Sequence, residues 1–152
     1  MIEIPIVVLY VMHMQVKDSW LQVRNFESED IVKIINWNIS WMHDIQKKIA
    51  HLQKLVEGQS FIAVLQEVKP SSYVALKNAF ESTAHIEYSL NYRIPGKYDT
   101  DSRKLGVAIL VSKDIDIQKA QIIDRALMPD RTLLVEVKYN NVSMRVLGLH
   151  SI

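Results

Sequence analysis

The chain has 152 residues, of which 49% are hydrophobic and 23% are charged. This length and composition are typical of one globular domain and exclude a globally disordered polypeptide. Its 18 Lys and Arg residues nearly balance its 17 Asp and Glu residues, so the formal net charge of +1 lacks the strong positive excess that is typical of polynucleotide-binding domains.

No cysteine is present, which excludes disulfides, thiolate metal sites and a cysteine nucleophile. Any metal ion would have to be bound by Asp, Glu, Asn or His side chains. Oxygen-rich sites of this kind suit Mg²⁺, Mn²⁺ or Ca²⁺. The absence of cysteine also fits a cytoplasmic protein, and we expect that location.

The most apolar run covers residues 4–12. It is too short to span a bilayer, which takes about 20 residues, so we favour a strand or an extension over a membrane anchor or signal peptide. A polar, acidic stretch at residues 25–30 follows. We therefore divide the chain into an N-terminal extension of uncertain structure, residues 1–30, and a domain over residues 31–152.

A strand–helix–strand unit is predicted at the start of the domain. Residues 31–39 and 61–65 are almost continuously apolar, as expected of strands that are covered on both faces. Between them, apolar residues at helical spacing predict an amphipathic helix, with Ser40 as its cap and Gly58 as its stop. The residues of this apolar stripe are Met42, Ile45, Ile49, Leu52 and Val56. With a right-handed crossover, the two strands should lie parallel.

The rest of the chain predicts one more helix and then strands. Pro70 suits the first turn of a helix whose inward face would carry Tyr73, Leu76 and Phe80. Strands are predicted over residues 86–94, 105–111, 115–123, 132–138 and 142–149. Asn140-Asn141 suits a tight hairpin turn between the last two strands. The predicted fold class is α/β (α+β): a mixed sheet with one βαβ unit, two helices on one face and further antiparallel strands.

The second face of this sheet also looks apolar, and something must cover it. No element is predicted after the last strand, which ends at residue 149, close to the last residue, Ile152. We therefore expect a chain that is incomplete or that pairs with a partner, for example as a homo-oligomer through the uncovered face.

Three polar residues stand at the ends of predicted strands. Asn38 and Glu67 close the two parallel strands, whose carboxyl ends lie at the edge where α/β sheets bind ligands. An amide oxygen and a carboxylate there could share a divalent cation. His150 ends the last strand and could hydrogen-bond a phosphate oxygen.

Each of these residues also has a purely structural interpretation. Asn38 could be a cap or turn residue before the following helix, Glu67 could be a surface carboxylate that pairs with Lys69, and His150 could be a satisfied strand-end histidine. The loop over residues 91–104 carries Arg93, Lys97, Arg103 and Lys104. It could bind a substrate phosphate or simply be a solvated loop.

The segments IINWNIS, which contains Asn38, and VLQEV, which contains Glu67, resemble the WN and QE motifs of the endonuclease/exonuclease/phosphatase (DNase-I-like) family. GVAILVSK, RTLLVEV and RVLGLHS are similar to later strands of that family, the last with His150 at its end. The resemblance covers about residues 31–152. It implies part of a two-layer β-sandwich flanked by helices.

The resemblance also implies a metal-dependent phosphodiester or phosphomonoester hydrolase that uses Mg²⁺ or Mn²⁺. Glu67 would be the metal ligand, while Asn38 and His150 would contact the substrate phosphate as catalytic residues. The substrate would be a phosphate ester, with nucleic acids among the candidates. DNA, RNA, phosphoinositides, sphingomyelin and nucleotides all occur as substrates in the family.

This sequence departs from the family in three respects. We expect the second half of the family's two-layer β-sandwich, which would cover the second face of the predicted sheet, to be absent. The D-x-N and S-D-H motifs, which supply the remaining catalytic residues, do not occur in it, and Ser40 stands where some members have an acidic residue. We therefore predict the N-terminal part of such a hydrolase, inactive alone. One alternative is a non-catalytic half-domain that dimerises or binds a partner. Another is an unrelated α/β domain, in which Asn38 and Glu67 could lie far apart.

Overall fold

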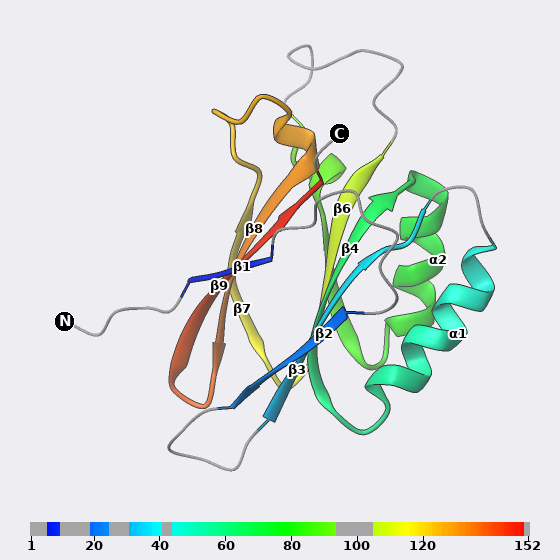
Figure 1. Ribbon diagram of the computed structural model, residues 1–152, viewed down its shortest axis with the longest axis vertical. Coiled ribbons are helices and arrows are strands. Elements are labelled where there is room, and N and C mark those ends of the chain that lie inside the picture. Colours follow the sequence, from blue (N-terminus) through cyan, green and yellow to red (C-terminus); the bar gives the residue numbers. More distant parts are fainter. Residues whose placement is uncertain (1–5, 10–18, 25–30, 41–43, 94–104, 151–152) are drawn as a thin grey trace.

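The computed structural model describes residues 6–9, 19–24, 31–40, 44–93 and 105–150. It consists of two β-sheets packed face to face, with two helices on the outer face of one of them (Figure 1). The α+β class and the helix-flanked sandwich that the sequence predicted are both confirmed.

The larger sheet has five strands, in the order β2-β3-β4-β6-β5. Within it, β3 and β4 are parallel, with Ile34 opposite Ile62 and Asn38 opposite Gln66, and the other pairs are antiparallel. The predicted parallel βαβ unit is therefore confirmed. The strands of this sheet are β2 (Ser19–Arg24), β3 (Ile31–Asn38), β4 (Ser60–Val68), β5 (Ala84–Tyr88) and β6 (Gly106–Ser112).

Two helices, α1 (Ile45–Val56) and α2 (Pro70–Phe80), cover one face of this sheet (Figure 1). Leu52, Leu76 and Phe80 are almost fully buried against it. The prediction that Pro70 opens a helix is confirmed.

The predicted cap of the first helix was wrong. The side chain of Asp44, not that of Ser40, accepts the hydrogen bond from the backbone nitrogen of Gln46 at 2.9 Å. Met42, predicted as part of the apolar stripe, lies outside the described residues. Gly58, with φ of 66°, follows the helix end in the left-handed conformation that suits a stop.

A second sheet of four strands, in the order β1-β9-β8-β7, packs on the other face of the first. The predicted hairpin is confirmed: β8 and β9 pair antiparallel, and Asn140 and Asn141 both have positive φ, as a tight turn requires. The strands of this sheet are β1 (Ile6–Leu9), β7 (Asp116–Gln121), β8 (Thr132–Tyr139) and β9 (Val142–Leu149).

The expectation of an uncovered sheet face was wrong. Val64 and Ile109 of the first sheet and Val135 and Val146 of the second are all fully buried in one shared core. The sequence pattern identified strands β3 to β9 but not the sheet to which each belongs, and it did not identify β2. The later strands therefore supply the cover that seemed to be missing.

The N-terminal segment contributes a strand to each sheet. β1 pairs parallel with β9 at one edge, and β2 pairs antiparallel with β3 at an edge of the other sheet. The division of the chain at Ile31 stays a prediction. Within the described ranges, no helix is long and apolar enough to cross a membrane.

The strand predicted over residues 86–94 is shorter than expected. β5 ends at Tyr88, and a 3-10 helix, η1 (Ser89–Tyr92), follows it. Ser89 is fully buried, and its hydroxyl bonds to backbone atoms of other elements. The alternation of apolar and polar residues that predicted a longer strand therefore does not continue as a strand beyond Tyr88. The predicted loop after residue 94 lies outside the described residues.

The contact between the two sheets predicts a strong effect at Gly148. A Cβ atom there would lie 2.6 Å from Cγ1 of Val107 and 3.0 Å from Cγ1 of Val64, both in the facing sheet. We expect Gly148→Ala to lower the free energy of unfolding by about 1 to 3 kcal/mol in urea denaturation, because of overpacking. Ser143→Ala, on the same strand but on its opposite face, is the matched control. Equal stabilities of the two variants would mean that Gly148 does not pack closely against Val107 and Val64.

Candidate functional site

The site lies at the edge of the larger sheet where the parallel strands β3 and β4 end. Asn38 is the last residue of β3, and Glu67 is the last residue but one of β4. Nδ2 of Asn38 donates a hydrogen bond of 3.0 Å to Oε1 of Glu67. Two of the three predicted site residues are therefore in direct contact, which counts against the interpretation as an unrelated domain with these residues far apart.

Glu67 occupies an irregular position in its strand. Between Leu65 and Val68, β4 contains one residue more than the facing part of β6, so the strand bulges. Glu67 itself has φ of 57°, a left-handed conformation that costs a non-glycine residue about 1 to 2 kcal/mol. Such bulges redirect the side chains next to them. Here the carboxylate is 11% exposed and faces Asn38 and His150.

His150 reaches the site from the second sheet. It follows directly after β9, and Nε2 of its ring lies 3.3 Å from Oε1 of Glu67. Its backbone nitrogen donates to the carbonyl oxygen of Arg131 at 3.0 Å, which fixes the chain at this point. The structure therefore brings Asn38, Glu67 and His150 together from three strands and both sheets.

A tight turn after β3 orients Asn38. Ser40 has φ of 46°, and its backbone nitrogen donates to Oδ1 of Asn38 at 2.9 Å. The carbonyl oxygen of Ser40 accepts a hydrogen bond of 2.6 Å from Nζ of Lys48 in α1. From the sequence, Ser40 was predicted to cap the helix and was noted as a departure from the family, and Lys48 was not singled out. The one available signal was a lysine at the flank of the apolar stripe, next to Ile49.

The pKa of the Lys48 ammonium is lowered by partial burial, while the negative charge of Glu67 acts in the opposite direction. A positive charge thus stands close to the carboxylate of the site. Lys69 contributes a further positive charge nearby, which also disfavours protonation of Lys48.

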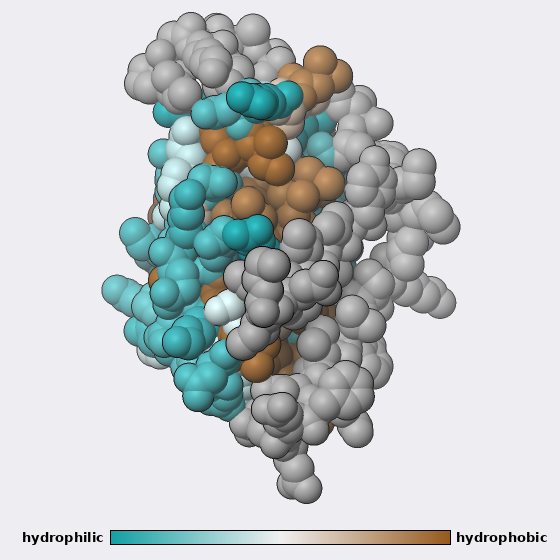
Figure 2. Space-filling view, turned by 90° about the vertical axis from the view of Figure 1, so that its left-hand side faces the viewer, coloured by the Kyte–Doolittle hydropathy of each residue, from teal (hydrophilic) through white to brown (hydrophobic). Residues whose placement is uncertain are grey.

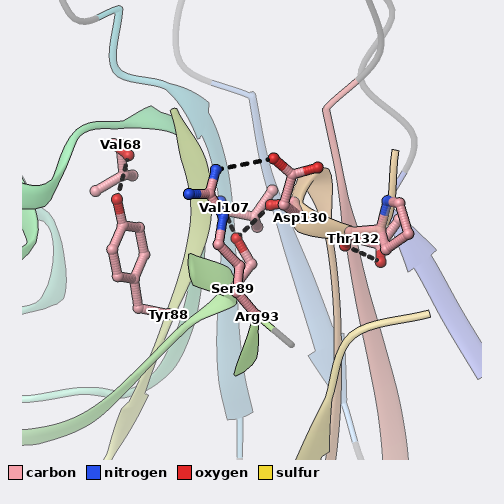
Figure 3. Close-up of polar contacts among 8 residues, drawn as sticks. Val68, Tyr88, Ser89, Arg93, Val107, Asp130 and Thr132 are labelled. Atoms are coloured by element: carbon pink, nitrogen blue, oxygen red, sulfur yellow. Dashed lines mark hydrogen bonds and ion pairs between the residues drawn. The ribbon is translucent and has the colours of Figure 1, made fainter. Parts of the chain in front are cut away.

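Buried polar contacts brace the same end of the sandwich (Figure 3). The hydroxyl of Tyr88 donates to the carbonyl oxygen of Val68, the neighbour of Glu67, at 2.7 Å. Burial raises the pKa of this hydroxyl, so it remains a donor at every physiological pH. The ring of Tyr88 stacks on that of Tyr73 with centroids 4.6 Å apart, which ties α2 to this contact.

A second set of contacts, also drawn in Figure 3, joins the two sheets. The hydroxyl of Ser89 donates to the carbonyl oxygen of Asp130 at 2.6 Å and accepts from the backbone nitrogen of Val107 at 2.9 Å. Nη2 of Arg93 lies 3.2 Å from Oδ2 of Asp130, whose side chain is fully buried. Arg93, predicted as a possible phosphate contact, thus pairs with a buried carboxylate, and Lys97, Arg103 and Lys104 lie outside the described residues.

The side chains of the site could bind a divalent cation, but they would not surround it. Within the described part of the chain, both contacts of the Glu67 side chain use Oε1, which leaves Oε2 available to a cation. Mg²⁺ is often held by one or two carboxylates, with water and substrate phosphate completing its shell. Among the described residues, no group of three or more His, Cys, Asp or Glu side chains could hold a metal ion. Glu67 therefore fits one ligand of an open metal site.

Comparison with solved structures gives clear matches to TDP2. The chain matches C. elegans TDP2 with a TM-score of 0.56 and 25% sequence identity, over 77% of this chain and 34% of that one. It matches truncated Caenorhabditis elegans TDP2 with a TM-score of 0.58 and 25% identity, over 78% of this chain and 46% of that one. It also matches D. rerio TDP2 complexed with a single-strand DNA product, with a TM-score of 0.56 and 16% identity, over 86% of this chain and 45% of that one.

The chain has the DNase-I-like fold of the endonuclease/exonuclease/phosphatase family. The chain spans between about a third and a half of the length of these neighbours. No family model and no curated protein matches the sequence.

The short contact between Asn38 and Glu67 predicts the behaviour of Asn38→Asp. Two carboxylates about 3 Å apart cannot both ionise freely, so one of them has a raised pKa in the folded state. Stability should then fall as the pH rises above about 4, where the carboxylates of the unfolded chain ionise. We expect a loss of about 1 to 3 kcal/mol at neutral pH, most of it recovered near pH 4.

Urea denaturation at the two pH values measures this effect. Asn91→Asp, at an exposed position, is the matched control and should show no such dependence on pH. A loss for Asn38→Asp that is equal at both pH values would mean that the two side chains are not in contact.

Proposed function

We propose that this chain forms the metal-binding half of a divalent-metal-dependent phosphoesterase active site of the endonuclease/exonuclease/phosphatase type. The observation that carries the proposal is the contact of Asn38, Glu67 and His150, at 3.0 and 3.3 Å, on a fold that phosphodiesterases share. These residues lie far apart in the sequence and have in common only their position at strand ends. A purely structural role for all three would leave that coincidence unexplained.

Each residue has a distinct role in this proposal. Glu67 would hold Mg²⁺ or Mn²⁺ through Oε2, the oxygen that Asn38 and His150 leave available. When bound, the cation would stabilise negative charge on the phosphoryl oxygens. Nδ2 of Asn38 and Nε2 of His150 are both directed at Oε1, so they fix the carboxylate. The second N–H of the Asn38 amide would donate to a phosphate placed beside it, whereas His150 has a single Nε2–H and would donate to the phosphate in place of Oε1.

We propose a nucleic acid, with DNA as the first candidate, for the substrate. Support comes from the D. rerio TDP2 structure, which is complexed with a single-strand DNA product. With a net charge of only +1, the chain would not attract a long polynucleotide strongly, because such binding depends on many cationic contacts. An enzyme that acts at the end of a strand fits this charge better than a processive one. The cytoplasmic location expected from the sequence stays a prediction.

Hydrolysis by this chain alone should be slow. Neither D-x-N nor S-D-H occurs in the sequence, and Glu67 is the one carboxylate in the contact of Asn38, Glu67 and His150. The groups that would activate water and protonate the leaving group would have to come from outside the described residues.

Metal binding can be tested without any activity. Titration with Mn²⁺, followed by NMR, should broaden the backbone signals of residues 38–40 and 66–68, because the ion is paramagnetic. Glu67→Gln should abolish this broadening, while Glu57→Gln, at an exposed position after α1, should leave it unchanged. Broadening that persists in Glu67→Gln would contradict the assigned metal site.

The same proteins test the catalytic competence of the chain. With Mg²⁺ and bis(p-nitrophenyl) phosphate or a single-stranded oligonucleotide, we expect the wild-type rate to be no higher than that of Glu67→Gln. The physical reason is the missing general acid and base, each of which typically contributes about 10² to 10⁴ in rate. Fast, Mg²⁺-dependent cleavage that Glu67→Gln abolishes would refute the predicted inactivity while supporting the site.

A non-catalytic, partner-binding module remains the second candidate, and one observation favours it. Figure 2 shows hydrophobic residues gathered on the side of the molecule where the second sheet lies. On the outer face of that sheet, Leu134 and Leu147 are cross-strand neighbours and only half-buried, and Leu127 on the preceding loop is 93% exposed. Large apolar patches often mark interfaces.

Light scattering over a concentration series separates the two candidates. A dimer that Leu147→Glu converts to a monomer would support the module. A monomer at every concentration, with Mn²⁺ bound at Glu67, would support the phosphoesterase site.

A further inference from the structure

The orientation of the Asn38 side chain is fixed by the turn that follows it. The backbone nitrogen of Ser40 is a donor, so it requires the oxygen of the Asn38 amide, at 2.9 Å. The amide nitrogen is thereby directed at Oε1 of Glu67, at 3.0 Å. With the amide turned the other way, two oxygens would face each other and two nitrogens would face each other. The Ser40 turn therefore determines which group Asn38 presents to the site.

This turn is strained. Ser40 has φ of 46°, a left-handed conformation that residues other than Gly, Asn and Asp rarely adopt. Unlike Asn, serine has no side-chain amide to support that conformation locally. Contacts from elsewhere in the protein must therefore hold the turn in place.

Lys48 supplies such a contact. Its side chain leaves α1, and Nζ donates to the carbonyl oxygen of Ser40 at 2.6 Å. Hydrogen bonds from an ammonium are shorter and stronger than those between neutral groups. Glu67 acts on the Lys48 ammonium to keep it charged, against the effect of burial on its pKa. The contact therefore connects the rigid helix α1 to the turn that sets the Asn38 amide.

We propose that Lys48 is a positioning residue of the site: its hydrogen bond to Ser40 holds the left-handed turn that directs Nδ2 of Asn38 at Glu67. The proposal rests on the proposed function for its catalytic meaning, but the geometry it describes exists without metal or substrate. A competing explanation is that the neighbouring strand pairing, in which the nitrogen of Ile39 donates to the oxygen of Gln66 at 3.1 Å, is sufficient to hold the turn. Lys48 would then be dispensable.

Lys48→Met separates these explanations, because it keeps the aliphatic stem and removes the donor. The matched control is Lys47→Met, at the exposed neighbouring position of the same helix. In NMR of the metal-free protein, we expect Lys48→Met to move the side-chain amide signals of Asn38 toward the values of solvated asparagine. Hydrogen exchange at the Ser40 amide should become roughly threefold to tenfold faster, which is the effect of losing one hydrogen bond. Lys47→Met should change neither signal.

A second substitution tests whether Lys48 acts on Asn38 through the Ser40 turn. Glycine adopts φ of 46° at little cost, so Ser40→Gly should restore the Asn38 signals in the Lys48→Met background. A role of Lys48 in general packing would not respond to Ser40→Gly. Lys48→Arg, which keeps a charged donor, should retain most of the wild-type signature.

Three outcomes would overturn the proposal: unchanged Asn38 signals in Lys48→Met, a shift that Ser40→Gly does not reverse, or unfolding of both the single and the double variant. The last would make Lys48 a residue of the fold rather than of the site. Because no readout uses metal or substrate, these failures are distinct from a failure of Mn²⁺ to bind at Glu67, which concerns the proposed function alone.

Discussion

The parallel pairing of β3 with β4 is the constraint on which the rest of this structure depends. It requires the crossover through α1, and the helices then cover one face of the sheet while β7, β8 and β9 cover the other. It also brings the ends of both strands to one edge, where Asn38 meets Glu67. A burial pattern in the sequence therefore leads directly to the geometry of the site.

Much of the fold could be predicted because local signals agree with the final structure. The continuously apolar strands, the helical stripe of α1, Pro70 and the Asn140-Asn141 turn each mark an element that is present. The errors have physical causes. Asp44 rather than Ser40 caps α1, because Ser40 belongs to the turn after β3. Alternating apolar residues show that β8 and β9 have one buried face, but not against which sheet it packs.

The three residues of the candidate site could be predicted from the sequence, but the backbone geometry and the contacts that orient them could not. Asn38, Glu67 and His150 were identified because each stands at a strand end, which topology makes significant. The bulge at Glu67 could not be predicted, because its left-handed backbone favours glycine and the sequence has glutamate at this position. Lys48 was missed because a lysine at the edge of a helical stripe is indistinguishable, in sequence, from a solvated one.

The distribution of the site over both sheets links it to folding. Asn38 and Glu67 can meet once β3 and β4 have paired, but His150 arrives only after β9 has joined the second sheet and that sheet has docked on the first. The complete constellation is thus a property of the native state alone. Any ligand that engages all three residues would bind the folded protein and not its precursors, and would raise the stability of the whole sandwich by mass action.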